Sequence, residues 1–281
     1  EYANIKGNVC IASQYQYKKH FYKGKTLLIA ISQSGETADT KKCVSQANEN
    51  NIDTLGIVNV KGSSITRICK NVIYTLAGPE IAVATTKAYL AQITTLILLA
   101  ISNSSVKVSE EEMQKLPYYI ENLINKDYVK LAKKLYKKDD IYFIGRGIDY
   151  ALAMEGSLKL KEISYIHSEA YAAGELKHGT ISLINEGTPV ISVATDEKLY
   201  LKTISNSKEV NARGAYSILI TNREIENDGV YDELILVPKV SPLLQSILTI
   251  IPMQVIAYEI AKLRGNDIDK PKNLAKSVTV E

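Results

Sequence analysis

Short apolar runs alternate with longer, partly polar stretches along this chain, and the whole pattern occurs twice. In the first half the predicted strands are 26–31, 53–60 and 71–77, and the predicted helices are 36–50 and 85–102. In the second half the predicted strands are 188–194, 215–222 and 232–238, and the predicted helices are 198–212 and 242–263. Strands that alternate with helices form parallel sheets with crossover helices. The sequence therefore predicts an α/β protein with two doubly wound parallel-sheet domains.

The two halves differ at the front. A further strand (141–144) and helix (149–165) precede the second set of elements, whereas the first set has too little chain before it for the same two elements. We therefore expect the first domain to lack its opening strand and helix. Residues 108–138 are predicted to form two connecting helices. The expected domains are 1–107 and 108–265, followed by a tail at 266–281.

Composition excludes several classes of protein. Of the 281 residues, 46% are apolar and 23% are charged, which is typical of a globular protein and not of a disordered chain or a coiled coil. The net charge of +3 gives no global case for binding nucleic acid. Three scattered cysteines without CxxC spacing favour neither disulfides nor a zinc site. A reducing cytosol is the expected compartment, and the apolar runs near 93–101 and 243–258 are expected to be too short to span a bilayer.

Small hydroxyl residues follow the first buried strand. Ser32, Gln33, Ser34, Gly35 and Thr37 lie between that strand and the next helix, where backbone N–H groups, hydroxyls and the helix dipole favour an anion. The alternative is that Ser34 only caps the helix. The matching residues of the second half, 194–197, include two carboxylates, so we expect only the first half to bind phosphate.

Four further side chains are candidates for acid–base or covalent chemistry. Lys159 and Glu162 are spaced i, i+3 on one helix face, which is usual for a solvated surface pair. His178 lies in a polar, glycine-flanked loop and is either an acid–base group or a surface residue. Lys276 lies near the end of the chain, where lysines are ordinarily exposed. A fifth feature, Gly145-Arg146-Gly147, follows a strand but lacks the G-x-G-x-x-G spacing of a dinucleotide site.

Several segments together resemble one known family. They are the loop SQSGETADT, the segment Glu80–Ala88, the stretch LKLKEISYIHSEAYAAGELKHG at 158–179 and the tail NLAKSVTVE at Asn273–Glu281. These segments resemble the sugar isomerase (SIS) domain superfamily, which has flavodoxin-like sheets. Within it they are most similar to the isomerase part of the glutamine–fructose-6-phosphate aminotransferases, also called glucosamine-6-phosphate synthases.

The resemblance implies roles for individual residues. Glu162 would move the proton between C1 and C2 of the sugar phosphate, supported by Lys159. His178 would open the sugar ring from the neighbouring subunit, which implies a homodimer, and Lys276 would form a Schiff base with C2 of the open ketose. The loop residues Ser32, Gln33, Ser34 and Thr37, with the backbone at Val83 and Ala275, would bind the sugar phosphate. The tail would close over the active site.

The implied activity is the transamination and isomerisation of fructose 6-phosphate to glucosamine 6-phosphate, the first committed step toward UDP-N-acetylglucosamine. Ammonia would come from a glutaminase domain that this chain does not resemble, and neither a cofactor nor a metal is expected. Three departures from the family pattern are Lys272 in place of Arg, Thr85 in place of Ser and Thr180 in place of Pro. The last is expected to loosen the loop after His178.

Two alternatives belong to other functional classes. One is a regulatory SIS module that binds a sugar phosphate without chemistry, and the other is a sugar-phosphate deglycase or deaminase on the same fold.

The expected loss of the first strand and helix of domain 1–107 has two further consequences. The missing segment of such domains normally helps to hold the phosphate, so we expect weakened affinity. The apolar run 8–13 is predicted to be a strand whose exposed edge favours aggregation.

Overall fold

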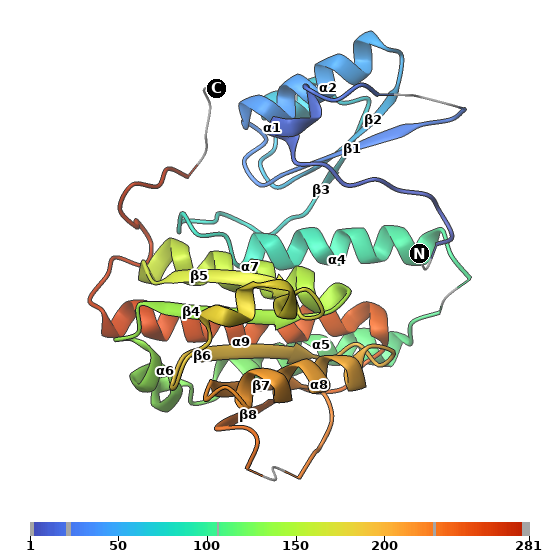
Figure 1. The fold of residues 1–281 in the computed structure, drawn as a ribbon. Helices are drawn as coiled ribbons and strands as arrows, with labels where there is room; N and C mark the ends of the chain where they lie inside the picture. The colour runs from blue at the N-terminus through green and yellow to red at the C-terminus, as the bar shows by residue number, and fades with distance from the viewer. Residues whose placement is uncertain (1–2, 21–23, 106, 227–228, 277–281) are drawn as a thin grey trace. The chain divides into compact units, whose positions relative to one another are not determined.

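The computed structural model describes residues 3–20, 24–105, 107–226 and 229–276. These residues form two compact units, one made of Glu1–Lys107 with Asn273–Glu281 and the other of Val108–Lys272 (Figure 1). Both units contain parallel sheets flanked by helices, as the sequence predicts. Each is described here in turn.

The second unit contains a five-stranded parallel sheet. Its strands are β4 (Asp140–Gly145), β5 (His167–Ala172), β6 (Pro189–Ala194), β7 (Tyr216–Thr221) and β8 (Glu233–Leu236). They are ordered β5-β4-β6-β7-β8, and every neighbouring pair is parallel. Counted within the unit, this is the 2-1-3-4-5 order of flavodoxin-like sheets, in which ligands bind at the carboxyl ends of the strands where the order reverses. Here that point lies between β4 and β6.

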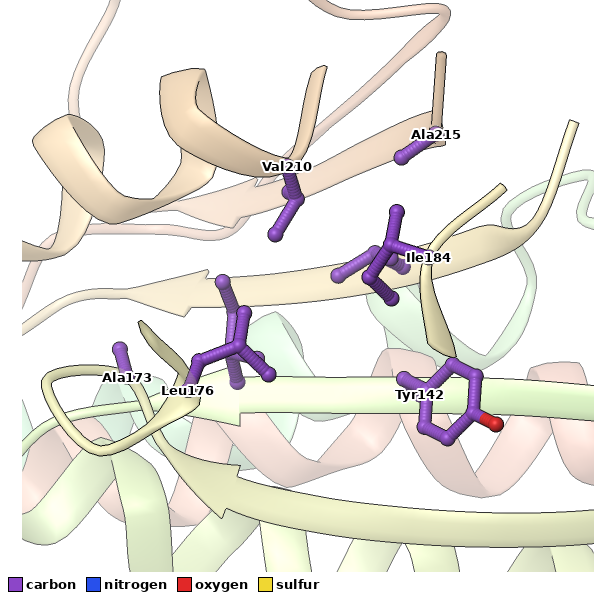
Figure 2. Packing of buried hydrophobic residues seen from close by; sticks show 8 residues of the cluster. Tyr142, Ala173, Leu176, Ile184, Val210 and Ala215 are labelled. Atoms are coloured by element: carbon purple, nitrogen blue, oxygen red, sulfur yellow. The ribbon is translucent and has the colours of Figure 1, made fainter. Parts of the chain in front are cut away.

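Helices cover both faces of this sheet. They are α5 (Glu110–Ile124), α6 (Val129–Leu135), α7 (Ile148–Ser164), α8 (Tyr200–Asn211) and α9 (Pro242–Leu263). Helix α7 packs on β4 and β5, while α8 packs on β6 and β7. Every residue of β6 is buried, as expected for a parallel strand covered on both faces. Figure 2 shows one part of this core, in which Tyr142, Leu176, Ile184 and Val210 belong to one buried cluster.

Helix α9 is the central helix of the second unit. It packs against α7, α5 and α6, and a Cβ added to Gly156 of α7 would lie 2.5 Å from Met253 Sδ, so α7 and α9 approach closely. Pro252 does not interrupt this helix. Its 22 residues are enough to span a bilayer by length, so the expectation that this apolar run is too short to do so is wrong. Among the described residues it is the single helix long and apolar enough to cross a membrane, but 78% of its most apolar window is buried, as in the core helix of a globular domain.

The first unit contains a three-stranded parallel sheet in the order β1-β2-β3. The strands are β1 (Leu27–Ser32), β2 (Asp53–Val58) and β3 (Asn71–Tyr74), and the helices are α1 (Ala12–Tyr15), α2 (Ala38–Glu49), α3 (Ser64–Ile68) and α4 (Lys87–Ser102). These strands match β6, β7 and β8 of the second unit. The described residues contain no counterpart of β4, α7 or β5. The predicted shortfall at the front is confirmed, and it amounts to two strands and a helix because sequence analysis missed β5.

The prediction of a strand at residues 8–13 is wrong. Within the described part of this segment, residues 3–11, no regular element forms, and α1 begins at Ala12. Val9 and Ile11 are exposed rather than paired in a sheet. The apolar composition favours a strand, but a strand forms only where a neighbouring strand offers hydrogen bonds and packing.

Candidate active site

The predicted phosphate loop connects β1 to α2 in the first unit. Ser32 ends β1, and its Oγ accepts a hydrogen bond from Gly35 N at 3.0 Å and lies 3.3 Å from Thr37 Oγ1. Gly35 has a φ of +68°, and a Cβ there would lie 2.0 Å from Ser63 Oγ, so only glycine fits without displacing its neighbours. The loop is a tight turn whose hydroxyl groups gather at the carboxyl end of the strand, where parallel sheets bind ligands.

The acidic residue of this loop is held by a different element. Glu36 accepts hydrogen bonds from Ser64 N at 2.8 Å and Ser64 Oγ at 2.6 Å at the start of α3. These bonds lower the pKa of the Glu36 carboxyl. The carboxylate is therefore engaged by the beginning of another helix.

The alternative role of Ser34 as a helix cap is wrong. Helix α2 begins at Ala38, and the residue at its cap position is Thr37. Ser34 Oγ instead accepts from Glu36 N at 3.2 Å within the turn. The serine belongs to the loop and not to the helix end.

A cleft of about 420 Å³ opens beside this loop. It is lined by Gln33, Ser34, Asn59, Val60, Gly78, Pro79, Glu80 and Lys276. Lys276 Nζ donates to the carbonyl oxygen of Ala82 at 2.5 Å. The fold thus places an amine from the end of the chain in one cleft with two residues of the predicted phosphate loop.

Two residues that sequence analysis missed shape this cleft. Asn59 Oδ1 accepts from Ala77 N and Thr75 Oγ1, and its Nδ2 donates to the Gly78 carbonyl oxygen. Glu80 Oε2 accepts from Ala88 N at 2.8 Å in the first turn of α4. Glu80 lies in the segment that carries the family resemblance, which was the available signal. Asn59 follows β2 at the carboxyl edge of the sheet.

Val83 and Ala275 do not line this cleft. Val83 follows Ala82, the acceptor of the Lys276 amine, and is half-buried. Ala275 precedes Lys276 and is exposed. The remainder of the tail, residues 277–281, lies outside the described residues.

Lys159 and Glu162 form a close ion pair on α7 in the second unit. Lys159 Nζ lies 2.5 Å from Glu162 Oε2, and the lysine side chain is only 5% exposed. A solvated surface pair would expose both partners, so that alternative is wrong for Lys159. An ammonium removed from water needs carboxylate partners, and this one has two.

The second carboxylate is Glu155, which sequence analysis missed. Its Oε1 lies 3.5 Å from Lys159 Nζ, and its side chain is 14% exposed. Burial raises the pKa of Glu155, and the nearby Lys159 ammonium partly opposes that rise. The spacing of Glu155, Lys159 and Glu162 (i, i+4, i+7) places all three on one helix face, which was a signal in the sequence.

His178 lies at the end of a short 3-10 helix, η1 (Leu176–His178), and its side chain is exposed. Its backbone N–H donates to the Glu175 carbonyl oxygen at 2.9 Å. Thr180 Oγ1 donates to the Leu176 carbonyl oxygen at 3.2 Å. The Thr180 side chain therefore makes a bond across this turn that a proline could not make.

A buried carboxyl group of α7 binds the loop after β6 in the second unit. Asp149 is 1% exposed and accepts hydrogen bonds from Thr195 N at 2.7 Å, Asp196 N at 2.9 Å and Thr195 Oγ1 at 2.5 Å. These donors lie at the position that corresponds to the Ser32–Thr37 loop of the first unit. From the sequence, the carboxylates at 196 and 197 are expected to repel phosphate. In addition, the Asp149 carboxyl group accepts the hydrogen bonds that Thr195 and Asp196 could otherwise donate to a phosphate.

The candidate residues therefore fall into two groups. The first unit contains the Ser32–Thr37 loop and Lys276, and the second contains Lys159, Glu162 and His178. Among the described parts of the chain, no group of three or more His, Cys, Asp or Glu side chains could hold a metal ion.

Comparison with known proteins bears on both units. A sequence model described as the SIS domain matches residues 9–102 and 134–262. The glutamine–fructose-6-phosphate aminotransferase (isomerizing) of Caldanaerobacter subterraneus subsp. tengcongensis is 48% identical over 292 residues, covering 100% of this chain and 48% of that protein. That of Clostridium tetani is also 48% identical and is covered to the same 48%. The chain thus spans about half the length of these curated relatives.

Solved structures give the same result. The C-terminal domain of glucosamine-fructose-6-phosphate aminotransferase from Francisella tularensis superposes with a TM-score of 0.88 at 33% identity, covering 96% of this chain and 80% of that one. Glucosamine-6-phosphate deaminase from Thermotoga maritima has a TM-score of 0.74 at 22% identity, covering 95% and 80%. The second similarity shows the fold alone. Because the family model covers both halves of the sequence and the Francisella domain matches nearly all of it, the chain belongs to the SIS domain family, in the group of the aminotransferase C-terminal domains.

Proposed function

We propose that this chain is the isomerase part of a glutamine–fructose-6-phosphate aminotransferase and converts fructose 6-phosphate to glucosamine 6-phosphate when ammonia is supplied. The observation that carries the proposal is the cleft shared by Gln33, Ser34 and Lys276. A hydroxyl-lined loop that suits a phosphate and an amine that suits a ketone are the two groups needed to hold and activate a ketose phosphate.

The chemistry assigns one role to each group. The loop holds the phosphate, and His178 moves the proton that opens the ring. The Lys276 amine attacks the C2 carbonyl and expels water to form an imine, and ammonia then displaces the lysine. Glu162 removes a proton from C1 and returns one to C2, while the proton of the C1 hydroxyl passes to the imine nitrogen, which leaves an aldehyde at C1 and an amine at C2. The Lys159 ammonium, buried beside Glu162, supports the charge that develops at the C1 oxygen.

The proposal extends to partners. In the whole protein the ammonia comes from a glutaminase domain, and His178 reaches the site of a neighbouring subunit in a homodimer. Such an enzyme acts in the cytoplasm on phosphorylated sugars. These points rest on similarity to relatives of which this chain spans about half.

The test is interconversion of fructose 6-phosphate and glucose 6-phosphate, compared between wild type and Glu162→Gln. The variant keeps the size of the side chain but removes the base, so we expect interconversion to fall by about 100-fold or more. The matched control is Lys161→Gln on the exposed face of the same helix, which should leave the rate within about 2-fold. Borohydride reduction with the ketose should label Lys276 in the wild type and in Glu162→Gln alike.

A protein that binds fructose 6-phosphate without interconversion or labelling would contradict the proposal and support the regulatory module. The similarity of the fold to a glucosamine-6-phosphate deaminase favours testing one other function. A deaminase would release ammonia from glucosamine 6-phosphate in water alone. A hydrolysis rate well above the amination rate at saturating ammonia would favour that alternative.

A further inference from the structure

The Gly145-Arg146-Gly147 motif has a structural use at the carboxyl end of β4. A Cβ on Gly145 would lie 2.6 Å from the backbone of Asp149, so the strand and α7 meet there without room for a side chain. Gly147 has a φ of +56° and precedes the first residue of α7. The two glycines form the turn and leave Arg146 as the one side chain that it presents.

Arg146 binds an amide on another element. Its Nε and Nη2 both donate to Asn206 Oδ1 of α8, at 3.1 Å and 2.9 Å. The half-buried guanidinium also lies close against Gly174, because a Cβ on that residue would lie 2.7 Å from Nη2 and 3.1 Å from Cζ. Arg146 thus touches both α8 and the loop that follows β5.

The same loop is attached at further points on either side of this contact. Ala173 N donates to the Gly145 carbonyl oxygen at 2.8 Å, and Leu176 is buried in the core cluster of Figure 2. Lys177 Nζ lies 3.2 Å from Glu209 Oε1, which also accepts from Asn206 Nδ2 at 3.3 Å. The Lys177 pair is half-exposed and contributes little by itself, so the Arg146 side chain, which contacts Gly174 and hydrogen-bonds Asn206, is the main side-chain link between this loop and α8.

His178 follows directly from these attachments, two residues after the buried Leu176. We propose that Arg146 is a positioning residue for His178: by binding Asn206 and packing on Gly174, it fixes the loop that presents the imidazole to the sugar ring. This inference rests on the proposed function. Proton transfer in ring opening requires the imidazole within hydrogen-bond distance of the ring oxygen, and a displacement near 1 Å can cost about 100-fold in rate.

Two substrates separate positioning of His178 from general damage. Fructose 6-phosphate must be opened, whereas a ketose 6-phosphate that lacks the 5-hydroxyl has no group to close the furanose ring and stays open. Arg146→Lys replaces a planar fork with a point charge, so it loses one bond to Asn206 and the guanidinium's close contact with Gly174. We expect turnover of fructose 6-phosphate to fall by about 10-fold or more while turnover of the open-chain analogue falls by less than about 3-fold.

Three reference variants complete the design. Gly174→Ala places a methyl group where the guanidinium lies and should reproduce the selective loss without changing Arg146 itself. His178→Gln sets the maximum selectivity. Arg264→Lys alters an exposed arginine that binds the Tyr136 carbonyl oxygen, and it should leave both substrates unaffected.

The inference is overturned if Arg146→Lys and Gly174→Ala slow both substrates equally or neither. A readout independent of turnover is the NMR signal of the His178 ring, which should shift and broaden in both variants and remain unchanged in Arg264→Lys. If wild type turns over neither substrate, the proposed function fails. The His178 signal then still decides whether Arg146 fixes the loop, and an unchanged signal in both variants overturns that point as well.

Discussion

Single residues of α7 have environments that their sequence types do not reveal. Lys159 is buried with a carboxylate on each side, at i−4 and i+3. Two carboxylates share one ammonium in a region from which water is largely excluded. The group left with the weaker bond, Glu155, is the one whose pKa is raised by burial.

This environment makes the stability of the chain depend on pH in a defined direction. Because the pKa of Glu155 is raised, the folded state binds its proton more tightly than the unfolded chain does. Its contribution to the free energy of unfolding is then fully present below the ordinary value of 4.5 and is lost as the pH rises through the folded pKa. We expect the stability of Glu155→Gln relative to wild type to increase with pH in urea denaturation from pH 4.5 to neutrality.

A control with the opposite sign is available on α5. The hydrogen bond from Lys115 lowers the pKa of Glu111, so its small contribution is present above the unfolded pKa and lost as the pH falls. Glu111→Gln should therefore lose a little stability relative to wild type as the pH rises. If Glu155→Gln behaves like Glu111→Gln, burial does not govern Glu155.

At the scale of elements, polar side chains connect segments that are distant in the sequence. Asp149, in the first turn of α7, binds the loop between β6 and α8 through three donors. Thr195 Oγ1 in turn accepts from Thr249 Oγ1 of α9 at 3.2 Å. This network links α7, β6 and α9 at the carboxyl edge of the sheet.

Removal of the Asp149 carboxylate should destabilise the second unit strongly. Asp149→Ala leaves two buried backbone N–H groups and a hydroxyl without their acceptor, at about 1–3 kcal/mol each, so we expect the free energy of unfolding to fall by about 3 kcal/mol or more. The measurement is urea denaturation followed by circular dichroism. Asp267→Ala is the control because Asp267 is exposed and bonds only neighbouring backbone. A loss no larger than that of the control would show that the network does not hold α7.

Most elements could be predicted from the sequence because their hydrophobic patterns are local. Helix α9 begins and ends at its predicted residues, and β1, β2, β6 and β7 lie within or within one residue of their predicted ranges. The pattern failed for β5, whose sequence HSEAYA is polar and forms a strand only because it pairs with β4 at the edge of the sheet. It failed in the other direction at residues 8–13, which are apolar but have no strand to pair with.

At the scale of the whole molecule, the sheet of the first unit has an exposed edge strand. Strand β1 lies at the edge of the described sheet, and Leu27, Ile29 and Ile31 on one of its faces are 42–51% exposed. An edge strand with an exposed apolar face is a template for pairing with another chain. We therefore expect self-association to occur at β1 rather than at residues 8–13.

Charge on this edge should reduce self-association. Lysines on edge strands oppose pairing because a neighbouring chain would have to bury the ammonium, so we expect Ile29→Lys to lower the rate of aggregation several-fold in static light scattering at matched concentrations. Leu201→Lys changes an exposed residue of α8 in the second unit and should have no such effect. Equal aggregation of wild type and Ile29→Lys would assign the association to another surface.

The sequence by itself determined most of the strands and helices, the two parallel sheets, the difference between the two repeats and the family. Each of these depends on local periodicity or on motifs of a few residues. Only the tertiary structure decided that Lys276 lines one cleft with Gln33 and Ser34, that Lys159 is buried between two carboxylates, and that Asp149 uses the donors after β6. Two of these arrangements join residues tens to hundreds of positions apart, and in the third the spacing on α7 is local but the burial comes from packing against other elements. Burial and hydrogen bonding of this kind arise only when the elements pack.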